Sequence, residues 1–169
     1  MPVRSVWHTG FSVADIDESI RFWSEGVGLV LRHRQIQENV YSSYLVGYPD
    51  VRLSVAQLQL PSGSTTISGH IIELIEYQRP RGEQEPLERS RIGSGHICLE
   101  VDDIDVIRER CEALGATFLS PTQDITAGIN AGGRAVYGQA PDGITFELLQ
   151  SPARPGTPTL ADPVSGSAP

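Results

Sequence analysis

Hydrophobic and polar residues alternate along the first half of the chain in short runs that are typical of β-strands. This alternation predicts strands over residues 5–13, 29–36, 39–47, 51–60 and 70–77. After the first run the period changes, and apolar residues recur at the spacing of one helical face: Ile16, Ile20, Trp23 and Val27. Asp15 or Asp17 is suited to cap this helix, which we expect over residues 15–26.

The second half repeats this order of elements. We expect a helix over residues 103–114 and strands over residues 96–101, 117–119, 134–140 and 144–150. The polar, charged and proline-containing stretch 80–93 is interpreted as a linker between a first module, residues 1–79, and a second module, residues 94–150. Residues 151–169 are rich in Pro, Ala, Gly and Ser, so we expect a disordered tail. Each module has the order βαβββ, which makes the fold class α+β.

Two segments that lie 88 positions apart resemble each other, and each begins with a histidine. His8 opens HTGFSVADID and His96 opens HICLEVDDID, with Val, Asp and Ile-Asp at identical offsets. A second similarity joins IIELIEY around Glu73 to ITFELLQ around Glu147. An internal repeat therefore supplies one early histidine and one late glutamate from each module. Two imidazoles and two carboxylates in equivalent positions indicate a metal site.

Strand parity places these residues on one face. In residues 96–101, the side chains of Ile97, Leu99 and Val101 form an apolar face, which leaves His96, Cys98 and Glu100 on the other. Glu73 and Glu147 likewise lie opposite apolar neighbours within otherwise hydrophobic strands. An unpaired carboxylate that is partly buried is costly, and a metal ion removes that cost. We therefore expect the metal ligands to project from the face that the helices do not cover.

Composition and charge narrow the class of function. The formal net charge of −8 and the pI near 4.9 argue against a nucleic-acid or anionic-membrane surface, since both need clustered Lys and Arg. No apolar run reaches transmembrane length, and the N-terminus has no signal-peptide hydrophobic region. Two cysteines do not make a disulfide framework, so we expect a cytoplasmic protein. A small molecule is the expected partner.

The candidate ligands and the segments around them resemble those of a known protein superfamily. The phrases FSVADIDESIRFWSEGVGL, SGHICLEVDDID and NAGGRAVYGQAPDGITFELLQ resemble the glyoxalase/bleomycin-resistance/extradiol-dioxygenase superfamily, also called vicinal oxygen chelate proteins. The resemblance covers about residues 4 to 150. It implies a cup-shaped mixed sheet built from paired βαβββ modules, and one divalent metal ion held by His8, Glu73, His96 and Glu147. It also implies a homodimer, in which two chains complete the cup.

The chain departs from individual branches of that superfamily. Glutathione-dependent glyoxalase I carries an arginine where this chain has Ser12, and an asparagine where it has Tyr77. Methylmalonyl-CoA epimerase, which is nearer in overall phrasing, typically has glutamine where Glu73 stands. Extradiol dioxygenases need two histidines and one glutamate, which His8, His96 and Glu147 would supply. Antibiotic-sequestering members have usually lost the four-ligand set.

The ligand set suits proton abstraction next to a carbonyl group. A divalent ion polarises a carbonyl oxygen, and Glu147, Glu73 or Glu100 is the candidate catalytic base. We therefore expect a metal-dependent lyase or isomerase, glyoxalase-like or epimerase-like, acting on a small carbonyl metabolite or acyl thioester. The alternatives are an Fe(II) extradiol-type dioxygenase and a metal-free antibiotic-sequestering protein. The donors suit Mn, Co, Ni, Zn, Fe or Mg without distinguishing among them.

Overall fold

The computed structural model describes residues 3, 5–61, 69–84 and 88–152. The first half forms a four-stranded sheet with the order β1-β4-β3-β2, whose strands are β1 (His8–Val13), β2 (Val30–Gln37), β3 (Arg52–Gln59) and β4 (Ile71–Arg79). The second half forms a sheet with the order β5-β9-β8-β6, and β7 pairs with β8. Its strands are β5 (Ile97–Glu100), β6 (Thr117–Phe118), β7 (Gln123–Asp124), β8 (Arg134–Gln139) and β9 (Thr145–Gln150).

The two sheets have the same connectivity. In each, the first strand pairs in parallel with the last strand, and the other long neighbours are antiparallel. Strands β1, β4 and β3 therefore correspond to β5, β9 and β8. This arrangement confirms the expected α+β fold of tandem βαβββ units with mixed sheets.

An aspartate begins the main helix of each unit. The Asp15 carboxylate accepts hydrogen bonds from the backbone N–H groups of Asp17 and Glu18 and so caps α1 (Ile16–Arg21). Asp103 caps α3 (Ile104–Ala113) in the same way. The first helix continues into a π-helical turn, η1 (Phe22–Gly26), so the predicted helix over residues 15–26 is confirmed with this change of pitch.

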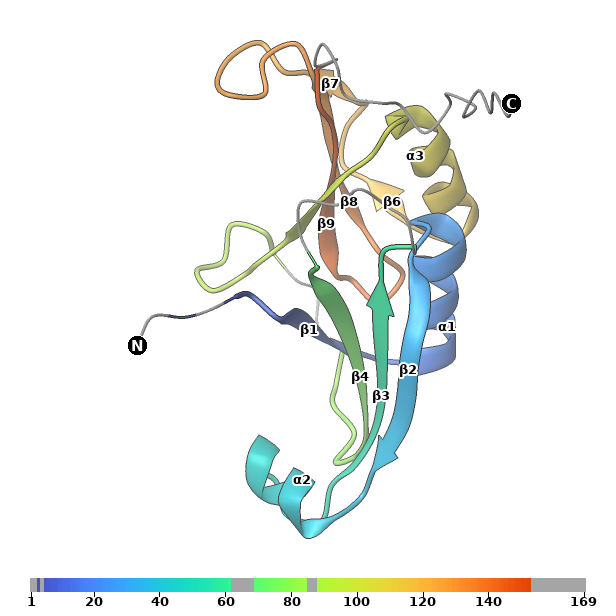
Figure 1. Cartoon of the computed structure of the whole chain (residues 1–169), viewed down its shortest axis with the longest axis vertical. Coiled ribbons are helices and arrows are strands. Elements are labelled where there is room, and N and C mark those ends of the chain that lie inside the picture. Colours follow the sequence, from blue (N-terminus) through green and yellow to red (C-terminus); the bar gives the residue numbers. More distant parts are fainter. Residues whose placement is uncertain (1–2, 4, 62–68, 85–87, 153–169) are drawn as a thin grey trace, which may run out of the picture.

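One hydrophobic core joins the two units. Figure 1 shows α1 and α3 on the same side of the molecule, and buried residues of both units pack together in one cluster. Trp23 is fully buried, and its ring centroid lies 6.1 Å from that of Phe146 on β9. A Cβ atom added to Gly26 would lie 3.2 Å from Leu114 Cδ1, so glycine allows η1 to approach α3 closely.

A polar contact also crosses between the units. Ser19 Oγ on α1 donates a hydrogen bond of 2.8 Å to Asp142 Oδ2 in the turn before β9. Burial raises the pKa of the Asp142 carboxyl above its ordinary value, and the bond from Ser19 opposes that rise. The PDG turn is therefore tied directly to the first helix, which fixes the start of β9 relative to the first unit.

The strand predicted over residues 39–47 is wrong, because this segment forms α2 (Val40–Val46). Asn39 caps the helix by accepting a hydrogen bond from the Ser42 backbone N–H, and Gly47 ends it with a φ of 77°. Val46 packs onto a second apolar cluster with Val51, Leu53 and Val55 of the β3 segment. Local capping and this contact outweigh the strand preference of the Val and Tyr residues.

The remaining predictions concern the short strands and the chain ends. Strand β7 was not predicted, since two residues carry no periodic signal. The predicted tail from residue 151 lies outside the described residues beyond residue 152. Within the described part of the chain, no helix is long and apolar enough to cross a membrane.

Replacing Trp23 with alanine tests whether the two units share one core. Because Trp23 is fully buried between units, we expect W23A to lower the free energy of unfolding by about 3–5 kcal/mol. Both units should still unfold in a single transition, measured by urea denaturation and circular dichroism. The control is I129A, since Ile129 is 95% exposed. Two separate transitions in W23A, with only one displaced, would contradict a shared core.

Candidate metal centre

The first candidate pair of metal ligands, His8 and Glu73, lies near the starts of two parallel strands, β1 and β4. Gly10 lies opposite Glu73 in the β1–β4 register, and His8, two residues earlier, shares the face of Gly10. His8 Nε2 lies 3.6 Å from Glu73 Oε2. The histidine side chain is 39% exposed and the glutamate side chain 16%, so the carboxylate is the more buried member.

The second candidate pair repeats this geometry in the other sheet. Cys98 lies opposite Glu147 in the β5–β9 register, and His96 precedes Cys98 by two residues. His96 Nε2 lies 3.3 Å from Glu147 Oε2, and the side chains are 42% and 19% exposed. Both pairs therefore present one imidazole nitrogen and one carboxylate oxygen from a sheet face that stays partly open to solvent.

The spacing within each pair fits two ligands of one metal ion. Donors about 2.1 Å from a metal, at angles between octahedral and tetrahedral, lie about 3.0–3.5 Å from each other. The observed 3.3 Å falls in that range, and 3.6 Å needs a shift of about a tenth of an ångström. Both distances exceed the usual N–H···O hydrogen-bond length of about 2.7–3.2 Å. The donor chemistry and the spacing therefore suit a divalent cation.

The structure brings the four proposed ligands together as two pairs and not as one cluster. Among the described residues of one chain, no group of three or more His, Cys, Asp or Glu side chains is placed to hold a metal ion. The pairs lie on different sheets, at the edge strands β1 and β5 and their inner neighbours β4 and β9. Each pair thus offers half of a four-ligand set.

The first pair has an amide neighbour that sequence reasoning missed. Gln57 lies opposite Glu73 in the β3–β4 register, and its Nε2 donates a hydrogen bond of 2.9 Å to Glu73 Oε1. Oε2, the other oxygen of Glu73, faces His8. The only sequence signal was the shared parity of Gln57 with Leu53 and Val55, and the strand register was needed to place it beside Glu73.

The second pair has hydroxyl and thiol neighbours. Tyr137 lies opposite Glu147 in the β8–β9 register, and its hydroxyl oxygen lies 3.1 Å from His96 Nε2. Burial, and then the negative charge of Glu147, raises the pKa of the Tyr137 hydroxyl above its ordinary value. The same two causes raise the pKa of the Cys98 thiol to about 11. Both groups therefore stay protonated beside the carboxylate near neutral pH.

Glu100, the third candidate base, is separate from both pairs. It is exposed at the end of β5, on the same strand face as His96 and Cys98. The Glu100 side chain makes no hydrogen bond or ion pair with any residue in the described part of the chain. Its position in the first unit corresponds to Ser12, so the repeat supplies no matching carboxylate there.

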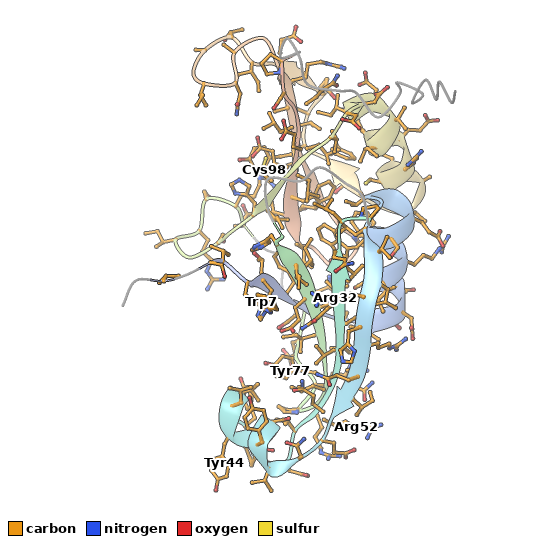
Figure 2. The ribbon with its side chains drawn as sticks, in the orientation of Figure 1. Trp7, Arg32, Tyr44, Arg52, Tyr77 and Cys98 are labelled. Carbon is orange, nitrogen blue, oxygen red and sulfur yellow. The ribbon has the colours of Figure 1, made fainter. Side chains whose placement is uncertain are left out.

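A hollow of about 760 Å³ lies beside the second pair. Its lining includes His96, Tyr137, Arg89, Ser94, Leu119 and Gln123. The corresponding face of the first sheet is filled further along by Val51, Leu53 and Val55, on which α2 packs. The second unit thus has room for a small molecule next to its histidine. Figure 2 places Cys98 on β5, the strand that directly follows His96.

The chain is similar to several known proteins. The family model of the Glyoxalase/Bleomycin resistance protein/Dioxygenase superfamily matches residues 7–137. A 2-epi-5-epi-valiolone epimerase of an Actinomyces species is 30% identical over 154 residues, which cover 88% of this chain and 80% of that protein. A probable lactoylglutathione lyase of Vibrio parahaemolyticus is 30% identical over 149 residues, covering 86% and 90% of the two chains.

Solved structures share the fold. A glyoxalase family protein from Bacillus cereus superposes with a TM-score of 0.77 at 21% identity, over 90% of this chain and 97% of that one. A glyoxalase I from Zea mays superposes with a TM-score of 0.61 at 20% identity, over 89% of this chain and 46% of that one. At these identities the likeness describes the fold alone.

Metal analysis tests the two pairs directly. We expect the purified protein to bind divalent metal stoichiometrically, and H8A and H96A each to lose it, because each variant leaves an incomplete donor set. The thermal midpoint of unfolding should fall in both variants, since a ligand that binds only the folded state stabilises it. The measurement is elemental analysis with differential scanning calorimetry.

The control for these variants is H70A. The His70 ring lies 2.7 Å from the Thr9 hydroxyl, and Thr9 alternates with His8 on the opposite face of β1. H70A should therefore keep its metal. Unchanged metal content in both H8A and H96A would place the site elsewhere.

Proposed function

Because the chain belongs to the glyoxalase/bleomycin resistance protein/dioxygenase superfamily, we propose that it is a divalent-metal-dependent isomerase or lyase acting on a small carbonyl metabolite. The superfamily membership that the sequence phrases suggested is confirmed, and the named relatives are enzymes of the epimerase and lactoylglutathione lyase kinds. The single observation that supports the proposal best is the pair of His–Glu contacts, which the repeat places at ligand spacing in both units.

His8, Glu73, His96 and Glu147 are the proposed metal ligands. Two neutral imidazoles and two carboxylates balance the charge of a divalent ion, which leaves little net charge in the site. When bound, such an ion polarises a substrate carbonyl and stabilises the negative charge of an enolate. The family match spans His8, Glu73 and His96 and ends before Glu147, whose assignment therefore depends on the repeat and on the 3.3 Å contact with His96.

The residues of this chain supply the proton transfer. A glutamate carboxylate takes a proton from the carbon next to the carbonyl group, and the electron pair of the broken C–H bond moves to give the enolate. Return of the proton to the opposite face of that carbon inverts its configuration, and return to a neighbouring carbon isomerises the compound. No oxidant or second substrate is needed.

We propose that the working protein is a homodimer. One chain presents two half-sites, so a second copy is needed to place a His8–Glu73 pair opposite a His96–Glu147 pair. Several large apolar side chains are exposed in the single chain, including Trp7 at 62% and Tyr44 at 84%. Figure 2 shows Tyr44 on α2 at one end of the molecule and Trp7 beside the start of β1. Burial of such a surface between two copies stabilises the dimer.

The substrate we favour is an oxygenated ketone or aldehyde without a glutathione moiety. Ser12 is exposed on the His8 face of β1. At this position glutathione-dependent glyoxalase I carries an arginine, which holds a carboxylate of its substrate. Tyr77 packs edge-on against Tyr48, with ring centroids 6.2 Å apart, so it closes a position where an asparagine is expected in that enzyme. An acyl thioester remains the second substrate class. Cys98 and Cys111 are free thiols, which suits the expected cytoplasmic location.

Solvent-deuterium exchange tests the chemistry. We expect the metal-loaded protein to exchange the α-proton of at least one compound in a panel of 2-oxo, 2-hydroxy and acyl-CoA compounds, followed by ¹H NMR. H96A should lose the exchange, because it lacks a complete donor set. Oxygen uptake with a catechol, without deuterium incorporation into any carbonyl compound, would replace the proposal with Fe(II) dioxygenase chemistry. Tight binding of a drug by the apo-protein, without either activity, would favour a sequestering protein.

Mixed dimers test whether sites form between chains. If each site combines the first unit of one chain with the second unit of its partner, H8A and H96A are each inactive but complement each other. A mixed dimer of the two variants contains one intact site and one doubly altered site. Random mixing should therefore restore roughly a quarter of the wild-type exchange rate. Refolding H8A alone is the control, and no recovery on mixing would contradict a site shared between chains.

A further inference from the structure

We infer that α2 of each chain docks against the hollow in the second unit of a partner chain, where Tyr41 and Tyr44 form one wall of the substrate pocket. This inference rests on the proposed function and deepens it, since it names the surface by which one copy completes the pocket of the other. It arises from a helix that turns its polar side toward its own chain and its apolar side toward solvent.

The side chains of α2 are distributed in the opposite way to those of an ordinary surface helix. Ser42 is 1% exposed, and its hydroxyl donates a hydrogen bond of 3.1 Å to Asn39 Oδ1. Ser43 Oγ accepts a hydrogen bond of 3.2 Å from the Val51 backbone N–H. Four large apolar side chains are 64–84% exposed: Val40, Tyr41, Tyr44 and Leu45. A contiguous apolar surface of this kind is typical of an interaction site.

Charged contacts hold α2 in place at both ends. Arg79, the last residue of β4, donates a hydrogen bond of 3.0 Å to Glu38 Oε1 and one of 2.7 Å to the Asp50 backbone oxygen. Arg52 forms a second ion pair with Glu38. Glu38 directly precedes the helix cap Asn39, and Asp50 follows the helix. The exposed tyrosines are therefore presented by a helix that is fixed before a partner binds, which lowers the entropic cost of association.

The helix lies on the sheet face that carries a candidate ligand. Glu73, Ile75 and Tyr77 share one face of β4, and Val46 of α2 packs on Ile75 and Tyr77 through the second apolar cluster. Four residues of strand span about 13 Å, so α2 lies about that far along the face from Glu73. An ion that takes ligands from both pairs brings this face against the Glu147 face of a partner. The helix then meets the second unit of that partner.

The two units have complementary shapes at this position. Val55 lies opposite Ile75 in the cluster that α2 covers, whereas Ala135, its equivalent, lies opposite Leu149 and lines the hollow. Figure 1 shows α2 and β7 at opposite ends of the molecule, so α2 does not reach the hollow of its own chain. A projecting helix on one face and a hollow of about 760 Å³ on the other fit together between two copies.

The charges favour a second copy as the occupant. Each chain has a net charge of −8, so two copies repel each other where carboxylates meet. Residues 40–47 carry no charged side chain, and no Asp or Glu of the described part of the chain lines the hollow. Arg89 lines the hollow and makes no ion pair with any described residue. A guanidinium group stacks favourably on a tyrosine ring, and Tyr41 and Tyr44 are exposed rings of that kind.

Photocrosslinking locates the surface that α2 contacts, without reference to activity. Tyr44 is replaced by p-benzoylphenylalanine, and a mixture of unlabelled and ¹⁵N-labelled protein loaded with Mn²⁺ is irradiated and analysed by mass spectrometry. We expect crosslinks between chains to residues 119–123 or 134–139. The control is the same replacement at Val106, which is 41% exposed on α3 and should give no such crosslink. Crosslinks to another surface would overturn the inference, and crosslinks to residues 153–169 would assign that segment as the occupant.

The substitution Y44S tests the energetic and substrate-binding parts of the inference. We expect the dimer dissociation constant, measured by sedimentation, to rise about tenfold or more, because a tyrosine at the centre of an interface contributes strongly. At concentrations where Y44S is dimeric, we expect KM for the fastest-exchanging panel compound to rise about tenfold, with kcat within about twofold of the wild-type value. V106S is the matched control and should change neither quantity.

Matching far-UV circular dichroism checks that Y44S and V106S are folded. Wild-type dimer affinity in Y44S would overturn the docking of α2. A weaker dimer with an unchanged KM would overturn the contribution of Tyr44 to the pocket.

The outcomes also separate this inference from the proposed function. A wild-type protein that gives the expected crosslinks but binds no Mn²⁺ and exchanges no compound would overturn the proposed function and leave the docking of α2 in place. A protein that binds metal and exchanges substrate, with Tyr44 crosslinked elsewhere, would overturn only this inference. A monomer in sedimentation would overturn the homodimer and the inference together.

Discussion

The parallel pairing of the first and last strands in each unit is the constraint on which the candidate site depends. This pairing brings residues far apart in sequence, His8 with Glu73 and His96 with Glu147, to within 3.6 Å and 3.3 Å. A parallel pair needs a long crossover, and here the crossover contains helices and further strands, from α1 to β3 in the first unit and from α3 to β8 in the second. The helix packs on one face of the sheet, so the histidine and glutamate are left on the other. The site is therefore a consequence of the topology.

The hydrophobic core that the two units share covers the helix-bearing face of both sheets. Trp23, Phe146 and the close approach of Gly26 to α3 join the helix-covered sides of the two sheets. With both helices committed to this contact, the parts of the opposite faces that carry the His–Glu pairs stay partly open to solvent in the described part of the chain. A site that needs four donors must then draw on a second copy, which is why we connect metal binding to dimer formation. The helix-covered faces thus contribute to stability, and we propose that the open faces take part in dimer formation.

The repeat preserves the ligands and allows their surroundings to differ. Position for position, Gly10 corresponds to Cys98, Ser12 to Glu100 and Gln57 to Tyr137. The first unit has also gained α2, which fills its open face with apolar side chains, whereas the second unit keeps a hollow. Two copies of one supersecondary unit therefore provide different environments for equivalent carboxylates.

The sequence by itself determined the repeat, the α+β class, the capped helices and the strand face of each candidate ligand, because all of these follow from local periodicity and capping. It misassigned residues 39–47, since Val and Tyr favour strands locally, whereas Asn39 and the contact of Val46 with β3 select a helix. Tertiary structure alone decided which side chains meet. Strand register placed Gln57 on Glu73 and Tyr137 beside His96, and the helix contacts kept the two His–Glu pairs apart within one chain. Register and packing depend on contacts between distant segments, and no periodicity within a segment encodes them.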